Sequence, residues 1–165
     1  MKTLLTIISL CALLAFAGCG DDSSDEETTS GGTTTAAESS EDTSTKPKVT
    51  VPDGEPPQEL VERDLVEGTG PEAKKGDEVT VQYVGVGYDS EKEFDASWDR
   101  GEPFTFQLGS GLVIPGWEQG VEGMKAGGRR ELTIPSDLAY GATGSPPTIG
   151  PNETLIFVID LVKIG

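Results

Sequence analysis

The chain has 165 residues, of which 29 are acidic and 12 basic, so its formal net charge is −17 at pH 7. A surface this acidic argues against nucleic-acid binding, which needs Lys and Arg to neutralise phosphates. The chain also contains no His and only 2 Cys, which excludes most metal-centred and nucleophilic catalysis.

Residues 1–18 are predicted to form an export signal. Lys2 gives a positive start, and an almost unbroken apolar run extends from residue 4 to residue 17. This run is shorter than the ~20 residues that span a bilayer. Small residues precede Cys19 and resemble a bacterial lipobox, with Phe16 at the position where Leu is usual.

Two interpretations of Cys19 stay open. Cleavage before Cys19 and lipidation of its sulfur, for example with palmitate, would make the protein a lipoprotein of the bacterial cell envelope. Alternatively, the signal is a plain secretory one and Cys19 is incidental. We favour the lipoprotein, because Cys11 leaves with the signal and a single leftover thiol is otherwise unexplained. The lipid would then be the only membrane contact of a domain that faces away from the cytoplasm.

Residues 19–58 are predicted to be the lipidated Cys followed by a disordered tether. Between residues 20 and 59 there are 11 acidic and 2 basic residues and no aromatic residue. Such a segment buries too little apolar surface to offset its ordering entropy. From residue 46 to residue 57 it becomes rich in Pro and stiffer. It is either a spacer or a segment that serves only solubility.

Residues 59–165 are long enough for one domain with one core. Alternating or continuous apolar patterns predict five strands. These cover 59–66, 78–88, 104–108, 130–135 and 154–164. One segment, 115–124, favours a helix, because Pro stands at its first position and Trp117, Val121 and Met124 share one face. The prediction is an α+β fold, in which a curled antiparallel five-stranded sheet wraps over one short helix.

Five strings in this domain, in this order and spacing, resemble the FKBP-type peptidyl-prolyl cis–trans isomerases over nearly all of residues 60–165. The strings are Tyr83-Val84-Gly85, Lys92-Glu93-Phe94-Asp95-Ala96-Ser97, Pro103-Phe104-Thr105-Phe106-Gln107-Leu108-Gly109, Val113-Ile114-Pro115-Gly116-Trp117-Glu118-Gln119-Gly120 and Ala139-Tyr140-Gly141-Ala142-Thr143-Gly144. The resemblance implies an FKBP-like fold and acceleration of rotation about X–Pro bonds.

The resemblance also assigns roles to residues of this chain. The catalytic residues implied are Tyr83, Phe94, Asp95, Trp117, Tyr140 and Phe157. The substrate-binding residues implied are Arg100, Phe104, Val113, Ile114 and Ile149. Trp117 would form the pocket floor, and the Ile114 N–H and the Tyr140 hydroxyl would hold substrate carbonyls.

Plainer interpretations exist for some of these residues. Trp117 alone would be taken as core, and Asp95 with Arg100 as an exposed ion pair of little energetic value. The resemblance favours a site role for all three. The 142–152 loop departs from the family at Ser145, Pro147 and Thr148, so the stretch from Gly144 to Pro147 is either a rigid loop or a substrate contact.

The leading functional prediction is an isomerase that acts on proline-containing segments of unfolded or exported polypeptides. It requires no cofactor and no metal, and we expect a monomer. A second hypothesis is a binding module that holds such segments with little turnover. A purely structural role would leave the aromatic cluster without a purpose.

Overall fold

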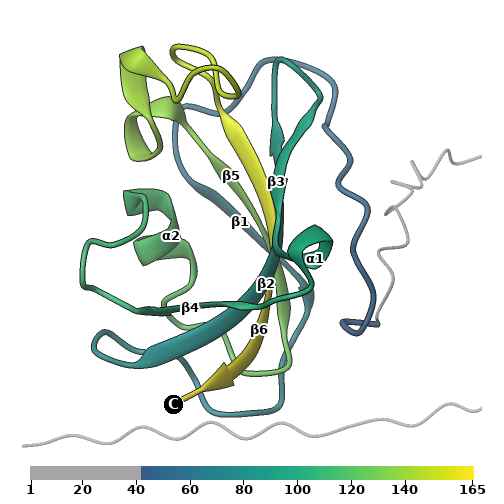
Figure 1. The fold of residues 1–165 in the computed structure, drawn as a ribbon, viewed down its shortest axis with the longest axis vertical. Coiled ribbons are helices and arrows are strands. Elements are labelled where there is room, and N and C mark those ends of the chain that lie inside the picture. Colours follow the sequence, from purple (N-terminus) through teal and green to yellow (C-terminus); the bar gives the residue numbers. More distant parts are fainter. Residues whose placement is uncertain (1–41) are drawn as a thin grey trace, which may run out of the picture. The chain divides into compact units, whose positions relative to one another are not determined.

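The structure is a computed structural model that describes residues 42–165, and one antiparallel sheet forms its frame (Figure 1). The strands are β1 (Val61–Val66), β2 (Glu78–Gly87), β3 (Glu93–Ala96), β4 (Phe104–Gln107), β5 (Arg129–Ile134) and β6 (Leu155–Ile164). They lie in the order β1-β5-β6-β2-β3, and β4 also pairs with β2. The predicted α+β fold with a curled antiparallel sheet is confirmed, with one strand more than expected.

The additional strand is β3, which the sequence analysis missed. Its 4 residues alternate between charged and apolar side chains, but a run this short is not distinctive as a strand. β3 pairs with residues 84–86 of β2, whereas β4 pairs with residues 78–81. Because β6 occupies the other edge of β2 along residues 79–87, β3 and β4 follow one another along the same edge.

A single helical turn, α1 (Ser97–Arg100), separates β3 from β4. Ser97 is fully buried, and its Oγ accepts a hydrogen bond of 2.8 Å from the Tyr83 N–H of β2. This bond replaces the strand pairing that is lost where β3 ends, since a buried N–H needs a partner. The interruption turns the chain away from the sheet between Asp95 and Arg100.

The predicted helix is α2 (Pro115–Gly120), which ends earlier than residue 124. Gly123 has a φ of +81° and donates its N–H to the Ala73 carbonyl at 2.9 Å, so the backbone leaves the helix there. Trp117, Val121 and Met124 are nevertheless all buried. No helix within residues 42–165 is long and apolar enough to span a membrane.

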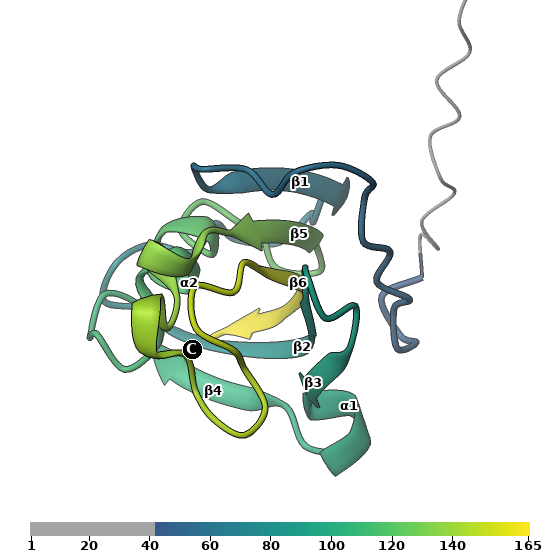
Figure 2. The same ribbon diagram turned by 90° about the horizontal axis from the view of Figure 1, so that it is seen from above.

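The two faces of the sheet are covered differently. Figure 2 shows the sheet curving around α2, so that the concave face contains the main core. Side chains alternate along a strand, and Val81 and Tyr83 of β2 point into this core. Val84 and Val86 belong to a second cluster on the convex face.

Residues 42–51, part of the predicted tether, lie against the convex face (Figure 1). We call this segment the strap. Val49 and Val51 pack against the convex cluster, and Pro47 is buried. The composition predicted disorder because it is polar, but a few well-placed apolar side chains give this part specific contacts with the sheet.

The two short 3₁₀ turns, Ser136–Leu138 and Gly141–Thr143, lie between β5 and β6.

Candidate active site

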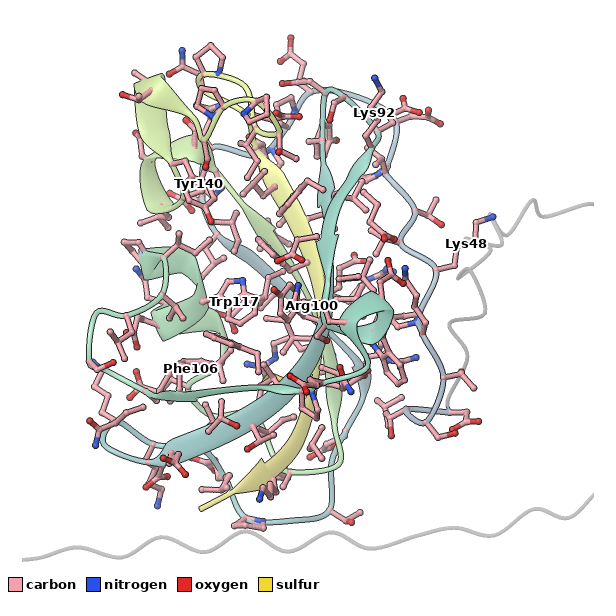
Figure 3. All side chains as sticks on the ribbon, in the orientation of Figure 1. Lys48, Lys92, Arg100, Phe106, Trp117 and Tyr140 are labelled. Carbon is pink, nitrogen blue, oxygen red and sulfur yellow. The ribbon has the colours of Figure 1, made fainter. Side chains whose placement is uncertain are left out.

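An open cavity of about 360 Å³ lies on the concave side of the sheet. Its walls come from four strands, from α2 and from two loops. The lining residues are Tyr83, Phe94, Asp95, Phe104, Leu112, Val113, Ile114, Trp117, Tyr140 and Phe157. Figure 3 shows Trp117 between α2 and the sheet, with Tyr140 above it and Phe106 below it in this orientation. Nine of these ten residues were among the predicted site residues.

Trp117 forms the base of the cavity. Its ring centroid is 5.0 Å from that of Tyr83 and 5.2 Å from that of Phe157, with interplanar angles of 81° and 87°. These edge-to-face contacts are the favoured arrangement for aromatic pairs and fix each ring against its neighbours. Only 5% of Trp117 is exposed, and its buried Nε1 has no hydrogen-bond partner among the described residues.

The wall beside Trp117 depends on a glycine in β2. A Cβ at Gly85 would lie 2.6 Å from the Phe94 ring and 2.8 Å from the Phe157 ring. Only a residue without a side chain leaves room for both rings to approach the strand. The two rings meet edge to face at 5.4 Å between centroids.

Three polar residues, Asp95, Tyr83 and Arg100, form one side of the rim of the cavity. Asp95 accepts hydrogen bonds from the Tyr83 hydroxyl and from Arg100 Nη1. Arg100 Nη2 also donates to the Tyr83 hydroxyl at 2.8 Å, and its guanidinium lies 5.5 Å from the Tyr83 ring centroid. Burial and the bond to Asp95 raise the pKa of Tyr83 above its ordinary value. The Tyr83 hydroxyl therefore stays protonated and holds Asp95 at the rim.

The loop before α2 is held by a side chain of the helix itself. Glu118 accepts hydrogen bonds from the backbone N–H groups of Gly109 and Gly111, the second at 2.8 Å. These bonds fix the loop whose next residues, Val113 and Ile114, line the cavity. The Ile114 N–H donates to no other described residue, so it is available to a ligand.

The remaining wall is Tyr140, which is 41% exposed. Burial of part of its ring and the nearby charge of Asp95 raise the pKa of Tyr140. Its hydroxyl is therefore a neutral donor at the mouth of the cavity. Together the site has an apolar base, a neutral donor at the mouth and an acidic group held at the rim. Within residues 42–165 no cluster of three or more His, Cys, Asp or Glu could hold a metal ion.

The comparisons with known proteins agree with this geometry. The family model described as FKBP-type peptidyl-prolyl cis-trans isomerase matches residues 70–162. The chain belongs to this family. An FK506-binding protein of Streptomyces anulatus is 58% identical over 120 residues, which cover 72% of this chain and 97% of that protein. A probable FK506-binding protein of Corynebacterium glutamicum is 48% identical over 118 residues, or 72% of this chain and 98% of that protein.

Solved structures of FKBP relatives share the fold. AtFKBP13 superposes with a TM-score of 0.60 at 40% identity, over 64% of this chain and 93% of the relative. FkpA from Escherichia coli gives a TM-score of 0.58 at 45% identity, over 64% of this chain and 47% of FkpA. The predicted fold and the predicted peptidyl-prolyl isomerase activity are thereby confirmed.

The FKBP cavity differs from the predicted site at three positions. Ile149 is 6% exposed and belongs to the core cluster, not to the cavity lining. Arg100 is not part of the lining either, but it binds Asp95 and Tyr83. Leu112 lines the cavity, is 74% exposed and was missed. The signal for it was an apolar residue directly after a Gly-Ser-Gly stretch, next to two predicted contacts.

Two other sequence predictions have different outcomes. The stretch 144–147 does not line the cavity. Ser145 instead pairs with Ile149 through backbone bonds of 3.0 Å in both directions, which supports the rigid-loop interpretation. Cys19 lies outside the described residues, and its lipidation stays a prediction.

Proposed function

We propose that the cavity accelerates X–Pro rotation by favouring the twisted imide over the planar one. The barrier of ~18–20 kcal/mol exists because resonance stabilises the planar form. That form is strongly dipolar, with negative charge on the carbonyl oxygen. In the twisted form the lone pair returns to nitrogen and the carbonyl is less polar. A dry aromatic site therefore disfavours the planar state more than the twisted state.

The observation that carries this proposal is the cavity of about 360 Å³ with the Trp117 indole at its base and aromatic rings around it. A proline ring is apolar and of a size that such a cavity accepts. A thousandfold acceleration needs only about 4 kcal/mol of differential stabilisation. Exclusion of water and shape complementarity are sufficient sources of an effect of this size.

The polar groups are assigned to positioning. A donor bonded to the rotating carbonyl would favour the planar, more polar state and slow the reaction. We therefore assign the Tyr140 hydroxyl and the Ile114 N–H mainly to carbonyls that flank the rotating bond. Asp95 orients the rim and is not a general base.

A series of peptides tests this assignment. Isomerisation of a Leu–Pro peptide is followed by NMR exchange spectroscopy with the full chain, and binding of the matched Leu–Ala peptide is titrated in parallel. Uncatalysed isomerisation takes tens to hundreds of seconds, roughly, and we expect exchange in the presence of the protein to be faster. We also expect weaker binding of the Leu–Ala peptide. Tight binding of both peptides without accelerated exchange would contradict the proposal and favour a holding module.

We also propose that the protein is a lipoprotein of the bacterial cell envelope, anchored through Cys19 and acting on exported polypeptides. The apolar run and the small residues before Cys19 support this. The anchor, the compartment and the expected monomeric state are separate proposals from the enzyme activity.

The anchor is tested by expressing the full chain and Cys19→Ser in a bacterium and comparing detergent-phase partitioning and mature mass. The wild type should enter the detergent phase and carry an acyl mass, and Cys19→Ser should stay in the aqueous phase. Cys11→Ser is the matched control, because Cys11 lies inside the predicted signal, and it should behave as wild type. Equal partitioning of wild type and Cys19→Ser would contradict lipidation.

A further inference from the structure

The strap reaches the segment of chain that carries part of the active site. Lys46 Nζ lies 2.8 Å from Glu93 Oε1 and 2.7 Å from Asp99 Oδ1. Glu93 is the first residue of β3, and Asp99 is in α1. The bonds to Asp99 and then to Glu93 raise the pKa of Lys46, so one ammonium group bridges the two ends of this segment.

The bridged segment, residues 93–100, supplies the outer wall and the rim of the cavity. Phe94 and Asp95 line the cavity, and Arg100 binds Asp95. Only three residues of β2 pair with β3, and the register shifts within them. A short, irregular edge strand is weakly held by its own ladder. A bridge across its ends therefore adds a constraint that the sheet does not supply.

The other contacts of the strap keep Lys46 in place. Next to it, Arg129 Nη2 donates to the Thr45 carbonyl at 2.9 Å. Arg129 is itself fixed by its buried ion pair with Asp160, at 2.9 Å for Nη2 to Oδ2. On the other side of Lys46, Val49 and Val51 pack on the convex cluster.

The apolar contact of the strap is incomplete, because a groove of about 580 Å³ lies between the strap and strands β2 and β3. The polar anchors at residues 45 and 46 must therefore contribute to its placement. Exposed ion pairs stabilise a fold little, and the side chain of Asp99 is 61% exposed. The consequence of the bridge is geometric: it restricts where residues 93–100 can lie.

We propose that the strap is a working part of the isomerase domain and that Lys46 is a positioning residue for the active site. The ammonium group of Lys46 holds β3 and α1 together, and this contact keeps Phe94, Asp95 and Arg100 in the arrangement that closes the cavity rim. The domain that catalyses at full rate therefore begins before residue 46, and not at residue 59.

The test uses the full chain, an uncharged proline peptide and three substitutions. In Lys46→Met, kcat/KM should fall about threefold, because Lys46 positions the wall of the cavity and makes no contact with the substrate itself. Lys46→Arg retains the charge and should recover most of the rate. Lys48→Met is the matched control, since Lys48 is an exposed lysine of the same strap, and its rate should equal that of wild type.

A double-mutant cycle with Asp99→Asn separates positioning from a general loss of stability. If the bridge acts as proposed, Asp99→Asn lowers kcat/KM in the wild-type background and has no further effect in Lys46→Met. Urea unfolding of each variant shows whether stability has changed. Wild-type kcat/KM in Lys46→Met, equal losses in Lys46→Met and Lys48→Met, or additive losses in the cycle would each overturn the proposal.

Discussion

The concave and convex faces of the same sheet are both apolar, but only the concave opening is lined by aromatic side chains. On the concave face the aromatic side chains of β2, β3, β4 and β6 surround α2 and leave a cavity of about 360 Å³. On the convex face Val84 and Val86 are covered by the strap, and Arg129 is paired with Asp160 in a buried position. Strand alternation sends one half of the β2 side chains to each face.

This difference separates two uses of apolar surface. On the convex face the strap buries Val84 and Val86, which are 1% and 7% exposed, so these apolar contacts contribute to stability. The concave face retains an opening lined by aromatic side chains, which is an arrangement that stability alone does not favour. Substitutions on the two faces should therefore be distinguishable by what they impair.

The largest effect is expected from breaking the buried pair on the convex face. Arg129→Met leaves the buried Asp160 carboxylate without its partner, and the free energy of unfolding should fall by about 3–5 kcal/mol. Urea denaturation monitored by fluorescence measures this. The double variant Arg129→Met/Asp160→Leu removes both charges and should recover much of the lost stability. If it does not, the unpaired Asp160 carboxylate is not the cause of the destabilisation in Arg129→Met.

On the concave face, Asp95→Ala should impair activity more than stability. The Asp95–Arg100 pair is exposed at 43% and 47% of its side chains, so its loss should change stability by only ~0–1 kcal/mol. Without Asp95, the Tyr83 hydroxyl and Arg100 lose the partner that holds them at the rim of the cavity. We therefore expect kcat/KM to fall about tenfold, which corresponds to about 1.4 kcal/mol. Peptide isomerisation and urea unfolding are measured together. The exposed Asp89→Ala is the control, and an equal rate in both variants would contradict the role of Asp95.

Gly85→Ala tests whether the positions of the aromatic rings on the concave face control the rate. Its methyl group would displace the Phe94 and Phe157 rings, because the Cβ would lie within 2.8 Å of both. We expect kcat/KM to fall about threefold through the misplaced walls, with a stability loss of ~1–3 kcal/mol from overpacking. Isomerisation kinetics and unfolding curves are compared with those of wild type. Unchanged kinetics would mean that the ring positions do not control the rate.

The smallest effect is expected from pH. The chain has no His, and burial raises the pKa of Tyr83 and of Tyr140 above its ordinary value. A raised pKa keeps each hydroxyl protonated to higher pH, so neither group changes charge near neutrality. We expect kcat/KM to vary less than about twofold between about pH 6 and pH 9. A bell-shaped profile in this range would reveal an acid or base that the proposed mechanism does not contain.

The two faces also differed in how far the sequence could predict them. Nine of the ten cavity residues were predicted, because most of them lie in strings that resemble the FKBP family, such as Phe94-Asp95 and Val113-Ile114-Pro115-Gly116-Trp117. Leu112 was missed since its loop follows no period. Ile149, predicted to bind substrate, lies in the core cluster and not in the cavity lining, and sequence order alone does not distinguish these two positions.

On the convex face the strap was not predicted. The sequence Lys46-Pro47-Lys48 is typical of a linker. The few apolar residues of the strap predict a contact only when Val84 and Val86 are known to lie on the convex face. The β3 strand was not predicted for a related reason. Its pairing depends on the edge of β2 that β6 leaves free, which is a property of the assembled sheet and not of the four residues themselves.

The account is tested most directly by replacing one buried aromatic residue at a time on the concave face. Trp117 and Phe106 are 5% and 4% exposed, and their ring centroids are 5.9 Å apart, but only Trp117 lines the cavity. Isomerisation of a proline peptide is measured by NMR exchange for Trp117→Leu and Phe106→Leu, under conditions in which both are folded. We predict a loss of at least about tenfold in kcat/KM for Trp117→Leu and near wild-type kinetics for Phe106→Leu. Equal rates in the two variants would contradict catalysis by this aromatic cavity.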